Sequence, residues 1–228
     1  MEWSEVKIRE PLYLNIGGYM DCDPSPNYLN YISVDMSGTA TTSVKHNLTE
    51  PIPLDDNSVD RILTEHFLEH TTPQDMTKIF NEFYRILKPG GIVRAAVPDY
   101  NHPRDMPFLK MGNDPRHTDH FTLTTYSKIK EIVAQSKFKT AKFYHYWDES
   151  RQFHCQPIDY SIGHIKRTPD NDPRCKMPAS FLKRCEIYIS NFFYKLKMGS
   201  KLQANDLLFR RGSKYAVTSL VFDLKKEA

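Results

Sequence analysis

One polar stretch of the chain holds imidazole and carboxylate groups at a spacing that suits proton transfer. His117 and His120 flank Asp119, and Asp99 lies upstream at the end of an apolar run. Imidazole titrates near neutral pH, and a neighbouring carboxylate can orient it and raise its basicity. These residues predict a general base that takes the proton of an acceptor hydroxyl. Each of them is also compatible with a solvated loop position, so the pattern alone leaves the choice of base open.

A second set of polar residues stands where five apolar runs end. They are Asn15, Gly17 and Gly18 after the first run, Asp35 after the second, Asn47 after the third, Glu65 and His66 after the fourth, and Asp99 after the fifth. Ligands of open parallel sheets bind beyond the carboxyl ends of the strands. Glycine lets a ligand approach the backbone, and an acid that ends the second strand can accept hydrogen bonds from both ribose hydroxyls. The set therefore predicts a site for an adenosine-containing ligand.

The turn after the first run argues against a phosphate-rich ligand. It reads NIGGYMDCDPSP, which lacks the second half of the G-x-G-x-x-G dinucleotide pattern. Pro24 and Pro26 oppose a long helix that would open there and face a pyrophosphate. A P-loop is absent from the sequence. The better fit is an adenosine ligand without phosphates.

The elements that must position these residues follow from periodicity. Apolar runs predict seven strands, near 11–16, 31–35, 43–48, 59–64, 92–99, 139–147 and 215–224. Helical spacing predicts amphipathic helices over 73–87, 124–138 and 180–197, the first of them stopped by Pro89-Gly90-Gly91. Long polar segments cover 100–121 and 148–178. The pattern indicates an α/β fold class, a doubly wound, mostly parallel seven-stranded sheet flanked by helices.

Composition sets outer limits on function. The 228 residues are 39% hydrophobic and 26% charged, which is ordinary for one globular domain. A net charge of +3 is too small to indicate a nucleic-acid partner. The four cysteines form no C-x-x-C pair, which is typical of reduced thiols in the cytoplasm. The sequence has no signal-peptide core and no transmembrane segment of about 20 apolar residues. A cytoplasmic protein is expected.

Five stretches in this order resemble successive motifs of class I S-adenosylmethionine-dependent methyltransferases. They are LYLNIGG, YISVDMS, HNLTEPIPLDDNSVDRILTEHFLEH, EFYRILKPGGIVRAAVPDY and the tail GHIKRTPDNDPR…SLVFDL. More narrowly, they are similar to short predicted methyltransferases linked to surface-polysaccharide (glycan) synthesis. The resemblance implies a Rossmann-like fold in a single domain over 1–228, with a helical insertion at 179–206. It also implies S-adenosylmethionine as cofactor.

Carried over by position, the resemblance assigns roles to the strand-end residues. It implies that Asn15, Gly17 and Gly18 line the methionine moiety, that Asp35 binds the ribose and that Met36 packs on the adenine, with Asn47 and Leu48 at its edge. Glu65 and His66 would close the pocket near the sulfonium. Asn15 stands where the family motif has an acid, which puts the contacts to the methionine amino group in question.

The same resemblance selects His117 as the general base, with Asp99 or His120 as partner or substitute. It implies O-methylation of a sugar hydroxyl; the sugar could be a deoxyhexose such as rhamnose in a glycan. If the chain is part of a longer protein, a neighbouring glycosyltransferase domain would be natural.

Three alternatives stay open. One is a methyltransferase for another small metabolite, a lipid or a protein side chain. Another is a metal-dependent hydrolase at His66 and His70, although Phe67 replaces the glutamate that an H-E-x-x-H site requires. For that reason we expect no metal ligands. The third is a non-catalytic binding module that keeps the fold.

Overall fold

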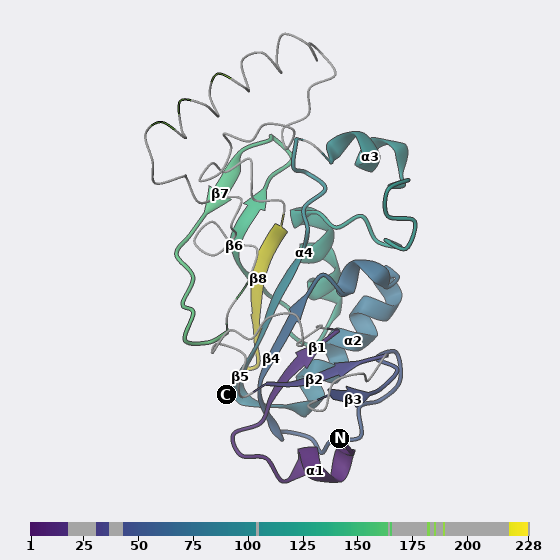
Figure 1. Cartoon of the computed structure of the whole chain (residues 1–228), viewed down its shortest axis with the longest axis vertical. Helices are drawn as coiled ribbons and strands as arrows, with labels where there is room; N and C mark the ends of the chain where they lie inside the picture. The colour runs from purple at the N-terminus through teal and green to yellow at the C-terminus, as the bar shows by residue number, and fades with distance from the viewer. Residues whose placement is uncertain are drawn as a thin grey trace.

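The computed structural model (Figure 1) describes residues 1–17, 31–36, 43–103, 105–163, 165, 182, 185, 189 and 219–227. Gly18 lies outside the described residues. So does most of the expected insertion at 179–206, of which Leu182, Cys185 and Ile189 are described, each in helical conformation.

Among the described residues, eight strands form a single sheet in the order β3-β2-β1-β4-β5-β8-β6-β7. Neighbours among β1 (Tyr13–Ile16), β2 (Tyr31–Asp35), β3 (Ser43–Lys45), β4 (Val59–Glu65) and β5 (Leu87–Pro98) pair in parallel. β8 (Ser219–Lys225) is antiparallel to both β5 and β6 (Lys142–Trp147), and β7 (Phe153–Cys155) is antiparallel to β6. Strand order reverses between β1 and β4. The arrangement confirms the predicted Rossmann-like, mostly parallel sheet.

The predicted strand count was one too low. β7 has only three residues, Phe153–Cys155, and lies at the edge of the sheet inside a segment predicted to be polar and irregular. Such a short run carries no usable alternation, and its strand conformation depends on pairing with β6. β5 also begins at Leu87, before the predicted 92, because its early residues pair with β4 across a register shift.

Helices α2 (Pro73–Ile86) and α4 (Tyr126–Gln135) contact each other and lie side by side in Figure 1. The hydroxyl oxygens of Thr72 and Thr125 cap their first turns by accepting backbone N–H groups. Their apolar residues join the main core with the inward side chains of the central strands. Two short helices, α1 (Trp3–Lys7) and α3 (Met106–Met111), and a three-residue 3₁₀ helix, η3 (Leu68–His70), were not predicted. None of the described helices has the length and apolar character needed to cross a membrane.

The opposite face of the sheet is covered, within the described part, by irregular chain. Ile158 and Ile165 pack there against Leu63, Ala96 and Val221. The buried guanidinium of Arg94 on β5 holds this segment, because its Nη1 donates to the carbonyls of Asp159 and Gly163, each at 2.6 Å. The sequence analysis predicted helices flanking the sheet. It could not predict this irregular segment, because the segment has no hydrophobic periodicity.

Candidate active site

The carboxyl edge of the sheet brings Gly17 beside Asp35. Residues of β1 and β2 pair in register up to Ile16 and Val34, and the N–H of Gly17 donates to the carbonyl of Val34 at 2.8 Å. Asp35, half-buried, ends β2 one residue later, and Met36 follows with 61% of its surface exposed. A carboxylate and an exposed thioether therefore lie next to a glycine turn, which fits a ribose and a flat base.

Gly17 is required for a reason that the sequence analysis did not foresee. Its φ is +67°, and a Cβ at this position would lie 2.4 Å from Cγ of Phe67. The missing side chain therefore makes room for the Phe67 ring as well as for the turn. Asn15, in contrast, is buried within β1, opposite Ser33 on β2 and Leu63 on β4.

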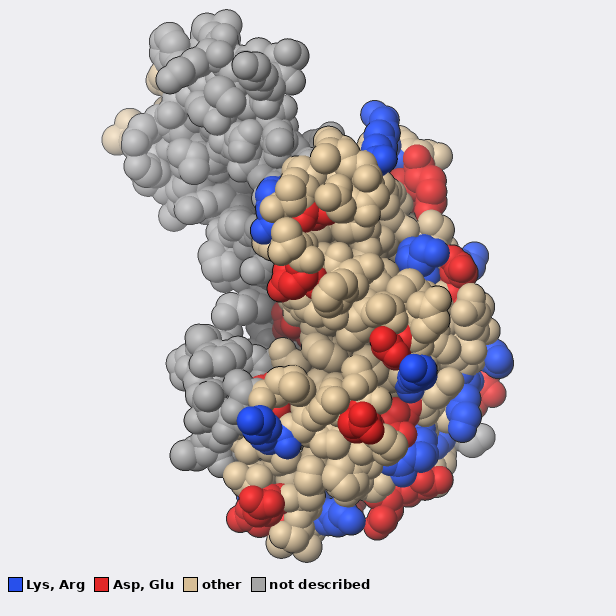
Figure 2. Space-filling model, turned by 90° about the vertical axis from the view of Figure 1, so that its right-hand side faces the viewer, with Lys and Arg blue, Asp and Glu red and all other residues tan. Residues whose placement is uncertain are grey.

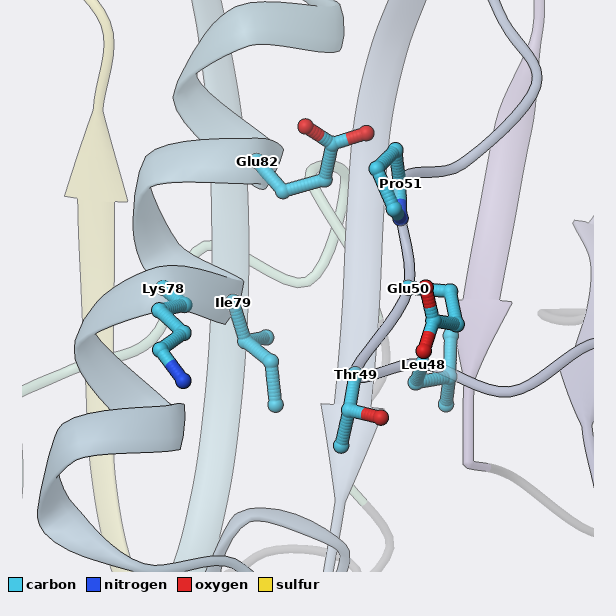
Figure 3. Close-up of a pocket in the computed structure, with 7 residues that line it drawn as sticks. All are labelled: Leu48, Thr49, Glu50, Pro51, Lys78, Ile79 and Glu82. Carbon is cyan, nitrogen blue, oxygen red and sulfur yellow. The ribbon is translucent and has the colours of Figure 1, made fainter.

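The segment after β3 separates the two residues expected at the adenine edge. Asn47 is exposed, and its Oδ1 accepts from both the N–H and the hydroxyl of Thr49, at 3.2 and 2.9 Å. Leu48 is buried and faces a hollow of about 220 Å³ between this segment and α2 (Figure 3). The hollow is lined by Leu48, Thr49, Glu50, Pro51, Lys78, Ile79 and Glu82. Glu82 accepts the N–H of Ile52 at 2.7 Å, which ties the segment to α2.

The residues after β4 turn toward the β5 side of the edge. Glu65 is half-buried at the end of β4. His66 has a φ of +52°, and its N–H donates to the carbonyl of Ala96 on β5 at 2.8 Å. Its Nε2 lies 3.0 Å from the hydroxyl of Ser219 on β8. His66 therefore faces β5 and β8, away from β2 and Asp35.

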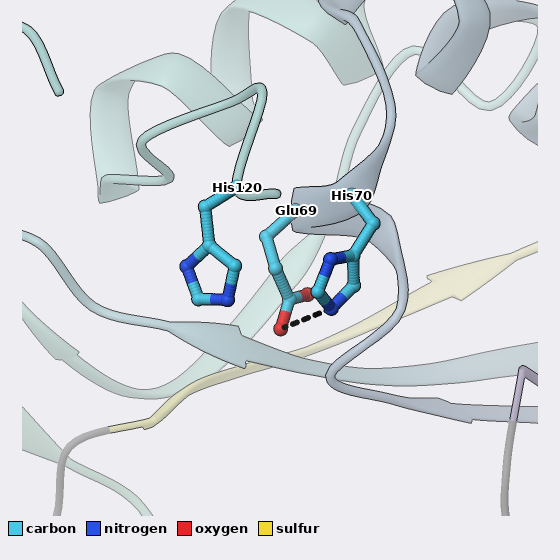
Figure 4. Close-up of side chains that lie close together, drawn as sticks. All are labelled: Glu69, His70 and His120. Carbon is cyan, nitrogen blue, oxygen red and sulfur yellow. Dashed lines mark ion pairs between the residues drawn. The ribbon is translucent and has the colours of Figure 1, made fainter. Parts of the chain in front are cut away.

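Next to His66 lies a group of carboxylate and imidazole side chains that come from distant parts of the sequence. Glu69, His70 and His120 place their ligand atoms within 4.8 Å of one another (Figure 4). Glu69 is fully buried, and its Oε1 lies 3.3 Å from Nδ1 of His66 and 4.0 Å from Nε2 of His70. A second such group, His117, Asp119 and His120, is mostly exposed. Both groups could hold a metal ion.

His120 is half-buried against Tyr100. The Tyr100 hydroxyl lies 2.7 Å from Nδ1 of His120 and donates to Oδ2 of Asp114 at 3.1 Å. Burial lowers the pKa of His120, which keeps the ring neutral. Burial alone would raise the pKa of Asp114, but hydrogen bonds from Arg116 outweigh it and hold this pKa below its usual range. Sequence reasoning missed Tyr100 and Asp114, since a lone tyrosine and a loop aspartate carry no signal.

His117 is exposed, and its ring stacks on that of His120 with centroids 4.7 Å apart. The expected partners of His117 were Asp99 and His120, and the structure places His120 against it. Asp99 has other partners: its carboxylate accepts the N–H of Asn101 at 3.1 Å and of Trp147 at 2.7 Å. Burial raises the pKa of Asp99 to about 7, against the effect of these two donors. Asp99 thus ties the start of the loop to β6, and the structure gives it no contact with His117.

The charged surface gives no further clue to a partner. On the face seen in Figure 2, Lys and Arg side chains of the described residues are interspersed with Asp and Glu.

Comparison with known proteins agrees with this geometry. Residues 7–95 match the family model described as a methyltransferase domain. A S-adenosylmethionine-dependent methyltransferase from Archaeoglobus fulgidus is 16% identical with a TM-score of 0.51, over 98% of this chain and 90% of that one. A methyltransferase solved with the Trm112 activator of Haloferax volcanii is 12% identical with a TM-score of 0.54, over 99% of this chain and 89% of that one.

Phosphoethanolamine N-methyltransferase 2 of Haemonchus contortus, solved with phosphomonomethylethanolamine and S-adenosylhomocysteine, is 18% identical with a TM-score of 0.50. The match covers 95% of this chain, which spans about half of that protein, 49% of its length. No curated protein shows a significant sequence match. At these identities the solved structures establish the fold. Residues 7–95 thus match a methyltransferase domain, and the chain shares its α/β fold with these solved methyltransferases.

Proposed function

We propose that the chain is a S-adenosylmethionine-dependent methyltransferase that methylates a sugar hydroxyl. The observation that carries the proposal is the position of Asp35 beside Gly17 at the carboxyl edge of β1 and β2, within the residues that match a methyltransferase domain. The same edge continues, past β4, into a group of histidines. A nucleoside site and a proton acceptor thus lie along one edge of the sheet.

The cofactor would be held by the strand ends. The Asp35 carboxylate would accept the two ribose hydroxyls, Met36 would cover the adenine, and the backbone at Gly17 would line the methionine moiety. S-adenosylmethionine, when bound, supplies a methyl group on a positively charged sulfonium. We further assign Asn15, Gly18, Asn47, Leu48, Glu65 and His66 to the walls of this site. The structure points Asn47 at Thr49 and His66 at Ser219, so their contributions would come through backbone or through positioning.

On the acceptor side, His117 would remove the proton of the hydroxyl. Its ring is exposed and is held flat against His120, so one face is oriented while the ring nitrogens remain reachable. A hydroxyl needs this help because its pKa lies far above 7. The sugar as acceptor rests on the resemblance of the motifs to glycan-linked methyltransferases, and so does a neighbouring glycosyltransferase domain in a longer protein. We place the protein in the reducing cytoplasm, and among the described residues Cys155 and Cys185 form no disulfide.

Calorimetry with S-adenosylhomocysteine tests the cofactor. The wild-type chain should bind it, and D35N should bind at least about tenfold more weakly, since it loses a charged acceptor for two hydroxyls. D148N serves as control, because Asp148 is likewise a half-buried aspartate but lies in the β6–β7 turn. No binding by the wild type at millimolar ligand would overturn the proposal.

A screen with radiolabelled methyl donor tests the acceptor. Methyl glycosides of hexoses and deoxyhexoses form the main arm, and phosphoethanolamine forms a second arm, chosen for its similarity to a neighbour's ligand. Methyl transfer to a glycoside supports a sugar hydroxyl as the acceptor. Transfer to phosphoethanolamine alone would contradict it and would indicate an amine acceptor. With the active glycoside, H117A should lower kcat by about 10²-fold or more while its affinity for S-adenosylhomocysteine stays unchanged. An H117A protein at full rate would remove the base assignment.

A further inference from the structure

The carboxyl group of Glu69 is buried and has no hydrogen-bond partner among the described residues. It is 0% exposed, and neither of its oxygens has a hydrogen-bond donor among the described residues. Nδ1 of His66 comes within 3.3 Å of Oε1 but does not meet the geometry of a hydrogen bond. Burial of an ionised carboxylate is costly unless a positive group compensates it. A cation held beside these oxygens would compensate Glu69.

The orientation of His70 shows what faces this carboxylate. Nδ1 of His70 lies 3.1 Å from the backbone carbonyl of Asp119 and 3.2 Å from its carboxylate. Both partners can only accept, so Nδ1 carries the hydrogen. In the neutral ring the lone pair is then on Nε2, the nitrogen that faces Glu69 at 4.0 Å (Figure 4). That distance is too long for a hydrogen bond.

His120 is fixed in the same way by Tyr100. The single hydroxyl hydrogen of Tyr100 goes to Asp114, which, ionised, can only accept. The contact of 2.7 Å between this hydroxyl and Nδ1 of His120 therefore needs the hydrogen on Nδ1. The lone pair of His120 is again on Nε2, and Figure 4 shows a ring nitrogen of His120 turned toward the Glu69 carboxylate. Two lone pairs and one carboxylate thus converge with no hydrogen between them.

We propose that Glu69, His70 and His120 bind a divalent transition-metal ion of the zinc class. Two imidazoles and a carboxylate suit Zn²⁺, Mn²⁺ or Fe²⁺. Metal-bound histidines characteristically donate their other N–H to a carboxylate, a carbonyl or a similar acceptor, as His70 and His120 do here. Three protein ligands leave a coordination position for water or for an oxygen of the acceptor. The proposal departs from the expectation, drawn from the sequence, that the chain has no metal ligands.

The proposed site differs from the metal site that the sequence analysis weighed at His66 and His70. Glu69 and His70 come from η3, whereas His120 comes from the loop about 50 residues later. His66, expected to pair with His70 in a metal reading, lies outside the group and contacts Glu69 alone of the three. The exposed group of His117, Asp119 and His120 is less suited, because Asp119 already accepts from His70. The inference does not depend on methyl transfer, and direct binding tests it without any acceptor.

The test is a Zn²⁺ titration of the full chain, free of affinity tag and stripped with chelator, followed by calorimetry. Wild type should bind one Zn²⁺ per chain, and Co²⁺ in its place should give visible absorption bands of a low-coordinate site. E69Q, H70N and H120N should each weaken Zn²⁺ binding at least about tenfold. H154N is the matched control, because His154 also pairs with a carboxylate, Asp148 at 2.7 Å, outside the group; its affinity should equal that of the wild type.

Thermal unfolding separates loss of the site from loss of the fold. E69Q is nearly isosteric and replaces a buried carboxyl group that has no hydrogen-bond donor, so without metal it should melt at or above the wild-type temperature. At equal Zn²⁺ concentration, the melting temperature of the wild type and of H154N should rise more than that of E69Q. The proposal is overturned if the wild type binds no Zn²⁺, or if E69Q binds it as tightly as the wild type does. Neither result would bear on binding of S-adenosylhomocysteine, which tests the proposed function separately.

Discussion

The hydroxyl of Tyr100 lies 2.7 Å from Nδ1 of His120 and donates its hydrogen to Asp114. This contact joins Tyr100, two residues after the end of β5, to the end of a long loop, and it determines which nitrogen of His120 faces Glu69. Burial raises the pKa of Tyr100, so it stays protonated at neutral pH. Tyr100 is thus a positioning residue for the proposed metal site.

Replacing Tyr100 with phenylalanine should weaken Zn²⁺ binding about 10- to 100-fold, because Nδ1–H of His120 loses its acceptor and the ring its orientation. Calorimetry with Zn²⁺ measures the effect. Y126F is the control, since Tyr126 stacks on Tyr146 and lies on α4 outside the group. If Y100F binds Zn²⁺ as tightly as Y126F, Tyr100 does not position His120.

Alanine at Gly17 should destabilise the fold by about 2 kcal/mol or more. The left-handed backbone alone costs about 1–2 kcal/mol for a residue with a Cβ, and that Cβ would meet the Phe67 ring at 2.4 Å. Chemical denaturation of G17A, F67A and the double variant measures both parts. The double variant should be more stable than the sum of the single effects predicts, because the clash is gone. Strict additivity would show that Phe67 is not the obstacle.

Replacing Arg94 with methionine should cost roughly 3–5 kcal/mol, since Asp223 would stay buried without its counter-charge, keeping the hydrogen bond from the Tyr144 hydroxyl. Arg94 makes two bonds of 2.9 Å to Asp223, from Nε and Nη2, across β5 and β8. The matched control is K88M. Lys88 pairs with Asp60 and Glu10, which are partly and largely exposed, so this substitution should cost less than about 1 kcal/mol.

Denaturant unfolding compares the two variants at pH 7. The double variant R94M/D223L should recover part of the loss, because it removes the unpaired charge. Equal costs for R94M and K88M would contradict a structural role for the buried pair.

The buried Asp99 should make stability depend on pH. Its pKa is about 7 in the fold against 3.8 for an ordinary aspartate. Below about pH 4 both the folded and the unfolded chain hold the proton; between about pH 4 and 7 only the folded chain keeps it, so the unfolding free energy falls as pH rises. Above about pH 7 this loss is complete.

The measurement is the unfolding free energy of wild type minus that of D99N across this range, since D99N cannot titrate. The difference should decrease with rising pH, by a few kcal/mol at most. A difference that grows with pH would mean that the N–H donors of Asn101 and Trp147 keep Asp99 ionised.

Local pattern was sufficient for most of the fold. The apolar run at 31–35 coincides with β2, because consecutive residues of this strand are buried on both faces. The helical spacing from Met76 to Ile86 coincides with α2, because this helix buries one face. The placement of Asp35 at a strand end follows from the same pattern. β7 could not be predicted, since three residues gain strand conformation only by pairing with β6.

The candidate site divides in the same way. The sequence by itself determined that Gly17, Asp35 and His66 stand at carboxyl ends of strands, since parallel strands must end at one edge. Only the tertiary structure decided that Phe67 fills the space over Gly17, that Asp99 faces Trp147, and that His120 reaches Glu69. These meetings depend on the course of η3 and of the loop after β5, which have no periodicity. Hydrogen bonds between distant residues, such as Tyr100 to His120, set that course, and no spacing along the chain encodes them.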